Sequence, residues 1–374
     1  MRHRLAELRG PDVPAKALDA RALAALAANP GCARRAILDG AGVDKARLAS
    51  ALGAPSGFGQ SQFALTRGNA FETKVKADGG AALLRLAHAR LDPGAEPPQG
   101  AAVPDLTAHG PEGRTARTAL ALREATRAGG WTLLDHPMLA LDVAGSLAFL
   151  EPDAVVVHPD GSWSVVEIKS FPMLDGSADP AKVGAAARQA AVYVLALEEV
   201  AGRLGAEPEG AAGAEGAPRV HHRILLVCPK DFSNLPAASA VDIRKQRAVT
   251  ARQLARLTRI EEIAGTLPEG TCFAPDRSAE ELTAAVEAVP ATYAPECLSA
   301  CELAFHCRER SREEGAVTRL GRPLRAELGG LTTVEDVLAA ARGESGDPAD
   351  PAVAALRRAA ALRAEALTDA AHRE

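Results

Sequence analysis

Aromatic residues are scarce in this sequence, where Phe, Trp and Tyr together make up 3% of 374 residues. Few aromatic side chains mean few platforms on which the bases of a single nucleic-acid strand can stack. The formal net charge is −5, so the chain also lacks the overall basic character that is common in proteins that wrap nucleic acid. The composition therefore disfavours a protein that only coats nucleic acid. It is compatible with an enzyme that has a narrow, locally basic cleft.

Long apolar runs are also missing. No stretch approaches the roughly 18 apolar residues of a membrane helix. Met1–Gly10 is charged and has no apolar stretch, so no signal peptide is expected. We therefore expect a cytoplasmic protein with no membrane partner. The sequence also lacks the G-x-x-x-x-G-K-[ST] motif, so any ATP-driven helicase is expected to be a separate partner.

What is present is enough apolar sequence for a full core, since hydrophobic residues make up 47% of the chain. Val-rich stretches and a Pro-Asp-Gly turn predict strands in the middle of the chain, with helical patterns on both sides. This order predicts an α/β fold, with helices that flank a small mixed sheet. Helices are expected over 16–50, 66–91 (broken at Gly79-Gly80), 116–129, 181–200 and 240–264, strands over Leu139–Phe149, Asp153–His158, Trp163–Lys169 and Arg223–Cys228, and loops over 92–115, 202–218 and 343–352.

The two strands around Pro159-Asp160-Gly161 carry charged residues at the end away from the turn. If the turn contains three residues, Asp153 lies opposite Glu167, and a two-residue turn shifts this by one position. Side chains alternate between the faces of a strand, so Glu167 and Lys169 share one face and Ile168 points to the other. Two carboxylates and an amine are therefore expected to converge at one end of a hairpin.

Such a cluster has a specific chemistry. Two nearby carboxylates repel each other, and a divalent cation relieves this repulsion. Oxygen ligands favour Mg²⁺ or Mn²⁺. Such a cation polarises a phosphodiester and lowers the pKa of a bound water, while Lys169 would orient that water or stabilise the developing charge. Taken alone, a Glu-x-Lys sequence on a strand is more often a solvated face.

Pro152-Asp153 followed by Glu167-Ile168-Lys169 resembles motifs II and III of the PD-(D/E)XK nucleases. Gln189-x-x-x-Tyr193, on the next predicted helix, resembles the Gln-x-x-x-Tyr motif of the RecB-like branch. Positions four apart share a helix face, so the two side chains are expected to lie together. Without the other motifs, these two residues would be read as helix surface and core. The resemblance implies a restriction-endonuclease-like core with additional N- and C-terminal helices, in which Gln189 and Tyr193 help to position the DNA strand. The regions expected are a helical region at 1–65, a nuclease core at 66–265, a second helical region at 266–342, and a linker with a terminal helix at 343–374.

The family also has an upstream motif, a helix with Gly followed four residues later by a metal-binding His. This sequence has Gly68-Asn69-Ala70-Phe71-Glu72, with Glu at the His position. A carboxylate is a good ligand for a hard cation, so Glu72 is expected to assist Asp153 and Glu167 in metal binding. The alternative is that Glu72 is a solvated helix residue.

Six cysteines in a reducing compartment point to metal ligands, core residues or reactive thiols rather than to disulfides. Cys297-x3-Cys301-x5-Cys307 is a tight cluster near the C-terminus, and Cys32 stands alone near the N-terminus. Four thiolates suit zinc or an iron–sulfur cluster. One cysteine before the nuclease core and three after it resemble the iron-binding RecB-like nucleases, among them AddB-type and CRISPR-associated spacer-processing nucleases. The resemblance implies a structural [4Fe–4S] cluster on these four residues, although the family triplet usually runs C-x2-C-x5-C. Cys228 is expected in the core, and Cys272 shows no evident partner.

A basic stripe is predicted on the helix expected at 240–264, where Arg252, Arg256 and Arg259 follow helical spacing. Such a stripe can contact phosphates, although a solvated face explains it equally well. Together these features predict a Mg²⁺- or Mn²⁺-dependent nuclease that hydrolyses DNA in repair, recombination or defence. The alternative is a catalytically inactive nucleic-acid-binding subunit of a larger nuclease or helicase complex.

Overall fold

The computed structural model describes residues 2–55, 62–100, 102–206, 217–231, 233–257 and 259–371. Within these residues the chain forms a five-stranded sheet and a separate β-hairpin. The sheet consists of β1 (Thr132–Asp135), β4 (Ala154–Val157), β5 (Trp163–Ile168), β6 (Arg223–Pro229) and β7 (Pro236–Asp242), and the hairpin of β2 (Leu139–Val143) and β3 (Ser146–Leu150).

The sheet is mixed, with the order β1-β4-β5-β6-β7. Neighbouring strands are antiparallel except for β5 and β6, which are parallel. A parallel pair needs a crossover connection, and α8 (Pro180–Ala206) supplies it. The expected mixed sheet with flanking helices is therefore confirmed.

The two faces of the sheet belong to two hydrophobic clusters. Leu134, Val155 and Val165 lie in the cluster that includes residues of α8 and of α7 (Gly110–Ala128). Their neighbours Leu133, Val156 and Val166 lie in the cluster that includes residues of α5 (Gln62–Val75) and α6 (Ala81–Leu91). Adjacent strand residues thus enter opposite layers, which follows from the two-residue period of a strand.

The predicted break at Gly79-Gly80 separates α5 from α6. Both glycines have positive φ angles, 65° and 80°, which side chains with a Cβ rarely adopt. A Cβ on Gly80 would lie 2.1 Å from Cδ2 of Leu133, so the close approach to β1 also requires glycine. The break therefore allows α5 and α6 to pack on the same face of the sheet.

The structure differs from the predicted strands at three places. Leu139–Phe149 is not one strand but the hairpin β2–β3, which turns at Ala144 and Gly145 with φ angles of 53° and 83°. β1 was not predicted, because the four residues Thr132–Asp135 are too few to show a period. β7 was not predicted either, because its Ala-rich sequence has weak strand propensity and it is stabilised by pairing with β6.

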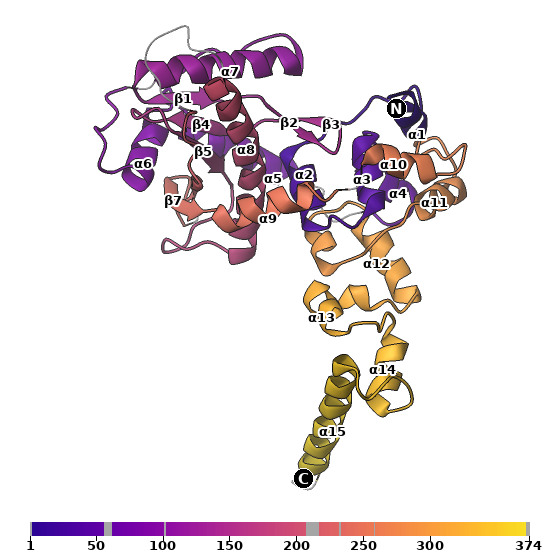
Figure 1. Cartoon of the computed structure of the whole chain (residues 1–374). Helices are drawn as coiled ribbons and strands as arrows, with labels where there is room; N and C mark the ends of the chain where they lie inside the picture. The colour runs from indigo at the N-terminus through magenta and orange to yellow at the C-terminus, as the bar shows by residue number, and fades with distance from the viewer. Residues whose placement is uncertain are drawn as a thin grey trace.

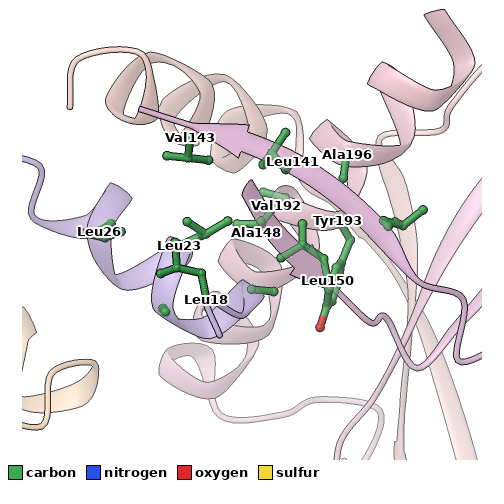
Figure 2. Close-up of a cluster of buried hydrophobic side chains, with 14 of the residues drawn as sticks. Leu18, Leu23, Leu26, Leu141, Val143, Ala148, Leu150, Val192, Tyr193 and Ala196 are labelled. Atoms are coloured by element: carbon green, nitrogen blue, oxygen red, sulfur yellow. The ribbon is translucent and has the colours of Figure 1, made fainter. Parts of the chain in front are cut away.

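The β2–β3 hairpin packs away from the main sheet. Figure 2 shows Leu141 and Leu150 of this hairpin with Leu23 of α2 (Ala20–Ala28) and Tyr193 of α8 in one cluster. Leu23 and Leu150 are fully buried. The hairpin thus joins the N-terminal helices to the helix that covers the sheet.

Segments from the two ends of the chain lie side by side (Figure 1). Leu8 O accepts a hydrogen bond from Phe273 N at 2.7 Å, and Pro290 O accepts one from Arg34 N at 2.9 Å. One core cluster continues from Leu8 to Leu303, while the exact domain boundaries stay a prediction. The helices of this region are α1 (Arg2–Arg9), α3 (Ala33–Gly40), α4 (Lys45–Ala51), α10 (Ile260–Thr266), α11 (Ala279–Glu287), η1 (Pro295–Ser299) and α12 (Ala304–Glu313).

The last helices extend away from the sheet (Figure 1). They are η2 (Val317–Leu320), α13 (Arg322–Glu327), α14 (Val334–Arg342) and α15 (Pro351–Ala371). The predicted linker at 343–352 connects α14 to α15, although α15 begins within it. Residues 207–216 of the expected loop at 202–218 lie outside the described residues. No helix in the described part of the chain has the length and apolar character needed to cross a membrane.

Candidate active site

The β4–β5 hairpin brings the two predicted carboxylates together. Ala154 pairs with Val166, and His158 N donates to Ser162 O at 2.8 Å across the turn. This is the register of a three-residue turn, so Asp153 lies opposite Glu167 as predicted. Ile168 enters the cluster of α5 and α6, as its position between Glu167 and Lys169 requires.

Glu167 is the most buried acidic group of the site, with 0% exposure. Its carboxylate forms an ion pair with Lys169, and neither oxygen has a well-formed hydrogen bond to the described residues. The pKa of Glu167 is raised to about 7, mainly because of burial; the charge of Lys169 opposes this rise, and the nearby Asp153 adds to it. An ionised carboxylate in this place needs a cation, because its burial is otherwise costly.

Asp153 lies beside Glu167 and is held by the backbone of the neighbouring strand. Its Oδ2 atom accepts a hydrogen bond from Ile168 N at 2.6 Å. Burial raises the pKa of Asp153, while the charge of Lys169 and the Ile168 hydrogen bond lower it. For Lys169, burial lowers the pKa but the charges of Glu167 and Asp153 outweigh it, so the net shift is upward. The ammonium therefore stays charged between the two carboxylates.

Gln189 and Tyr193 extend this cluster onto α8. Lys169 Nζ lies 3.4 Å from Gln189 Oε1, and Gln189 Nε2 donates to Tyr193 Oη at 3.0 Å. Tyr193 in turn donates to Glu151 O at 3.2 Å. Tyr193 is 4% exposed and lies in the core, as Figure 2 shows, while its role in positioning DNA stays a prediction.

Glu72 on α5 contacts two residues that the sequence motifs did not identify. Its Oε1 atom lies 2.6 Å from Lys76 Nζ and 3.0 Å from His136 Nε2. These contacts lower the pKa of Glu72 to about 2, with the His136 hydrogen bond as the largest cause. Lys76 also lies 2.6 Å from Asp135 Oδ1 and 2.8 Å from Asp153 O. Glu72 is therefore partly exposed and ion-paired, and its role as a metal ligand stays a prediction.

Sequence reasoning missed Lys76, Asp135 and His136 for different reasons. Lys76 is four residues after Glu72, a spacing that places the two on one helix face, and this was the one available signal. Asp135 and His136 end the short strand β1, which the sequence did not reveal. Their proximity to Asp153 follows from the antiparallel pairing of Asp135 with Ala154.

A groove of about 820 Å³ opens beside Lys169 and Gln189. Its walls come from α2, α8 and α9 (Arg244–Leu254), and one end includes Ala300. Exposed basic side chains line it, together with small apolar residues. The basic residues besides Lys169 are Arg21, Lys182, Arg188 and Lys245.

The predicted basic stripe is not one helix face. α9 ends at Leu254 and α10 begins at Ile260, so Arg252 lies on α9, Arg256 lies in the turn, and Arg259 caps α10. After this turn, Ile260 packs against Gly40 of α3. The common phosphate-binding face expected for these arginines is therefore wrong.

The four predicted cluster cysteines come together from both ends of the chain. Cys32 directly precedes α3, and the chain on either side of it contacts the C-terminal cysteines: Asn29 Nδ2 lies 3.4 Å from Cys297 Sγ, and Arg34 contacts Cys307. Burial raises the pKa of Cys297, Cys301 and Cys307. Within the described ranges, no set of three or more His, Cys, Asp or Glu side chains is arranged to hold a metal ion.

Basic side chains of α3 join this cysteine group. Arg34 Nη1 lies 3.3 Å from Cys307 Sγ, and its guanidinium also donates to Val289 O at 3.2 Å. Arg35 donates to Ala300 O at 3.0 Å. Cys228 is fully buried in β6, as predicted, whereas Cys272 has a partner in Arg277.

The sequence matches no protein-family model, and none of the curated proteins compared with it is significantly similar.

Proposed function

We propose that this protein is a metal-dependent DNA nuclease that hydrolyses phosphodiester bonds, with the PD-(D/E)XK centre of the RecB-like branch. The observation that carries the proposal is the buried carboxylate of Glu167, which lies opposite Asp153 and contacts Lys169. The same three residue types at this spacing form the family motif. Gln189 follows on α8 with a direct contact to Lys169.

The donor set fits a hard divalent cation. Glu167 has two buried oxygens without hydrogen bonds in the described residues, and Asp153 retains one oxygen beyond its bond to Ile168. Asp153 and Glu167 would hold Mg²⁺ or Mn²⁺, which prefer such oxygen ligands. When bound, the cation supplies charge neutralisation at the phosphate and activates water. Glu72 is left out of this proposed ligand set, because its carboxylate is paired with Lys76 and His136.

The side chains around this centre have separate tasks. Lys169 places a positive charge where negative charge develops on the phosphate, which is an efficient form of transition-state stabilisation. Gln189 accepts a hydrogen bond from the Lys169 ammonium and donates one to Tyr193. Gln189 and Tyr193 therefore fix the position of the ammonium. Tyr193 is anchored to the Glu151 backbone and in the core, which makes it a rigid support.

The four cysteines are proposed to hold a [4Fe–4S] cluster, with zinc as the alternative. Cys32, Cys297, Cys301 and Cys307 form the donor set, and thiolates suit either metal. These four cysteines would connect the start of α3 to the segment from η1 to α12, so the proposed role of the metal is structural. Visible absorbance and metal analysis of anaerobically purified protein distinguish iron from zinc.

Cleavage of end-labelled DNA tests the proposed function. We expect single- or double-stranded DNA to be cut in Mg²⁺ or Mn²⁺ and cleavage to stop when EDTA removes the cation, because Asp153 and Glu167 act through it. The assay is repeated after Mg²⁺ is restored, which controls for damage by the chelator. Cleavage that persists in EDTA contradicts the proposal, and a protein that binds DNA without cutting it supports the inactive-subunit alternative.

The groove beside Lys169 is the proposed path of the DNA strand, in place of the arginine stripe. Lys182 and Lys245 are exposed on its two walls and lie on different helices, α8 and α9. Replacing both by Ala is expected to weaken DNA binding and to lower the slope of log affinity against log salt by about 2, roughly 1 for each lost phosphate contact. The turnover rate at saturating DNA should not change.

The matched control is the pair Arg252→Ala and Arg256→Ala, two exposed cations outside the groove. Its salt slope is expected to equal that of the native protein. A larger effect of the arginine pair than of the lysine pair contradicts the groove as the strand path. The affinity for fluorescently labelled DNA, measured at several salt concentrations, gives the salt slope of each double variant.

A further inference from the structure

Lys76 is the most highly coordinated cation beside the candidate centre. Its ammonium lies 2.6 Å from Glu72 Oε1, 2.6 Å from Asp135 Oδ1, 2.8 Å from Asp153 O and 3.1 Å from His136 Nε2. The side chain is only 12% exposed. An ammonium has three protons, so the three oxygen atoms at these distances can each accept one of them, while His136 Nε2 donates to Glu72.

The partners of Lys76 are of the kinds that bind divalent cations: two carboxylates, one imidazole and one backbone carbonyl. They come from three separate segments, namely α5, the end of β1 and the start of β4. The carbonyl belongs to Asp153, a residue of the candidate metal centre itself. Lys76 therefore lies directly beside that centre, and its charge acts on Asp153.

The backbone of His136 is strained in this arrangement. Its φ angle is 44°, a left-handed conformation that is strained for a residue with a side chain. Arg114 donates to His136 O at 2.9 Å and to Glu151 Oε1 at 2.9 Å, which holds the strained residue in place. This backbone directs the imidazole to Glu72 and Lys76.

We propose that Lys76 is a positioning residue that acts as a fixed cation at the metal centre, in the place that a second divalent ion would otherwise take. This inference rests on the proposed function, because it assigns a neighbour to the cation held by Asp153 and Glu167. The ammonium fixes the Asp153 backbone and neutralises Glu72 and Asp135. The native protein then binds one divalent cation at this centre, and Glu72 acts through Lys76 instead of as a direct ligand.

The test is the number of Mn²⁺ ions bound per chain, measured by electron paramagnetic resonance and calorimetry with Mn²⁺ alone. Removal of the ammonium by Lys76→Ala leaves Glu72, Asp135, His136 and the Asp153 carbonyl without their cation. We expect Lys76→Ala to bind one more Mn²⁺ than the native protein. An equal number in the two proteins overturns the inference.

Two variants serve as controls. Lys76→Arg keeps a positive charge at this place and is expected to keep the native number of Mn²⁺ ions. Lys74→Ala removes an exposed lysine from the same helix and is expected to change nothing. If Lys76→Ala does not fold, as judged by circular dichroism, Lys76→Met keeps the aliphatic stem without the charge and its Mn²⁺ count decides instead.

The inference and the proposed function fail in different ways. The inference concerns the difference between native and Lys76→Ala protein, whereas the proposed function requires the native protein to bind Mn²⁺ and to cut DNA. Native protein that binds one ion and a variant that also binds one overturn the inference alone. Native protein that binds none contradicts the proposed function, even when the variant gains an ion.

Discussion

Lys169→Ala is expected to reduce the rate of DNA cleavage about a thousandfold while the protein still binds Mn²⁺, since the loss of one well-placed transition-state contact costs a factor of about 10²–10³. Lys169 contacts Glu167 and Gln189 and supplies the positive charge of this group of three side chains. Its removal also frees the Glu167 carboxylate from a competing cation. Mn²⁺ affinity is therefore expected to be equal to or higher than that of the native protein.

Single-turnover kinetics measure the cleavage rate, and calorimetry with Mn²⁺ measures the Mn²⁺ affinity. Lys230→Ala, which removes an exposed lysine just after β6, is the control and should cut at the native rate. Equal cleavage by native protein and Lys169→Ala would show that Lys169 is not catalytic or that a contaminant cuts the DNA. Loss of Mn²⁺ binding together with cleavage would show that Lys169 supports the fold of the site and does not act on the reaction.

Asp39→Ala is expected to lower the free energy of unfolding by about 3–5 kcal/mol, the usual cost of removing one partner from a buried ion pair. The Asp39 side chain is 1% exposed and lies 2.5 Å from both Arg35 and Lys45, whose side chains are also buried. Without Asp39, two cations remain in the interior. Arg35 also reaches Ala300 O and Glu302, so the loss is expected to loosen the contact between α3 and the cysteine segment.

Urea denaturation measures this effect. Asp12→Ala removes an exposed carboxylate from the same N-terminal region and should change stability by less than about 0.5 kcal/mol. A similarly small change for Asp39→Ala would contradict the view that Asp39 is essential for the charge balance of this region. Asp39→Asn, which keeps the shape without the charge, should destabilise the protein in the same direction.

The β4–β5 hairpin could be predicted from the sequence because local rules define it. The turn at Pro159-Asp160-Gly161 sets the register, and the two-residue period of a strand then sets the face of each side chain. Asp153 and Glu167 are therefore paired in the structure as expected. The spacing of Gln189 and Tyr193 on a helix is equally local, and their mutual hydrogen bond follows from it.

The basic stripe could not be predicted because it depended on one continuous helix. The spacing of Arg252, Arg256 and Arg259 is helical, but the chain turns between them and Ile260 then packs on α3. A tertiary contact thus outweighed the local pattern. The strands β1 and β7 could not be predicted for the same reason: pairing with neighbouring strands stabilises them more than their own composition does.

The sequence by itself determined the hairpin, its carboxylates and the lysine between them, since neighbours along the chain specify each of these. Only the tertiary structure decided that Lys76 meets Asp135 and His136, that a basic groove leads to Lys169, and that the segment before Cys32 contacts Cys297. These groups come from segments that are far apart in sequence. Their meeting depends on how helices pack on the sheet, and no spacing in the sequence records that packing.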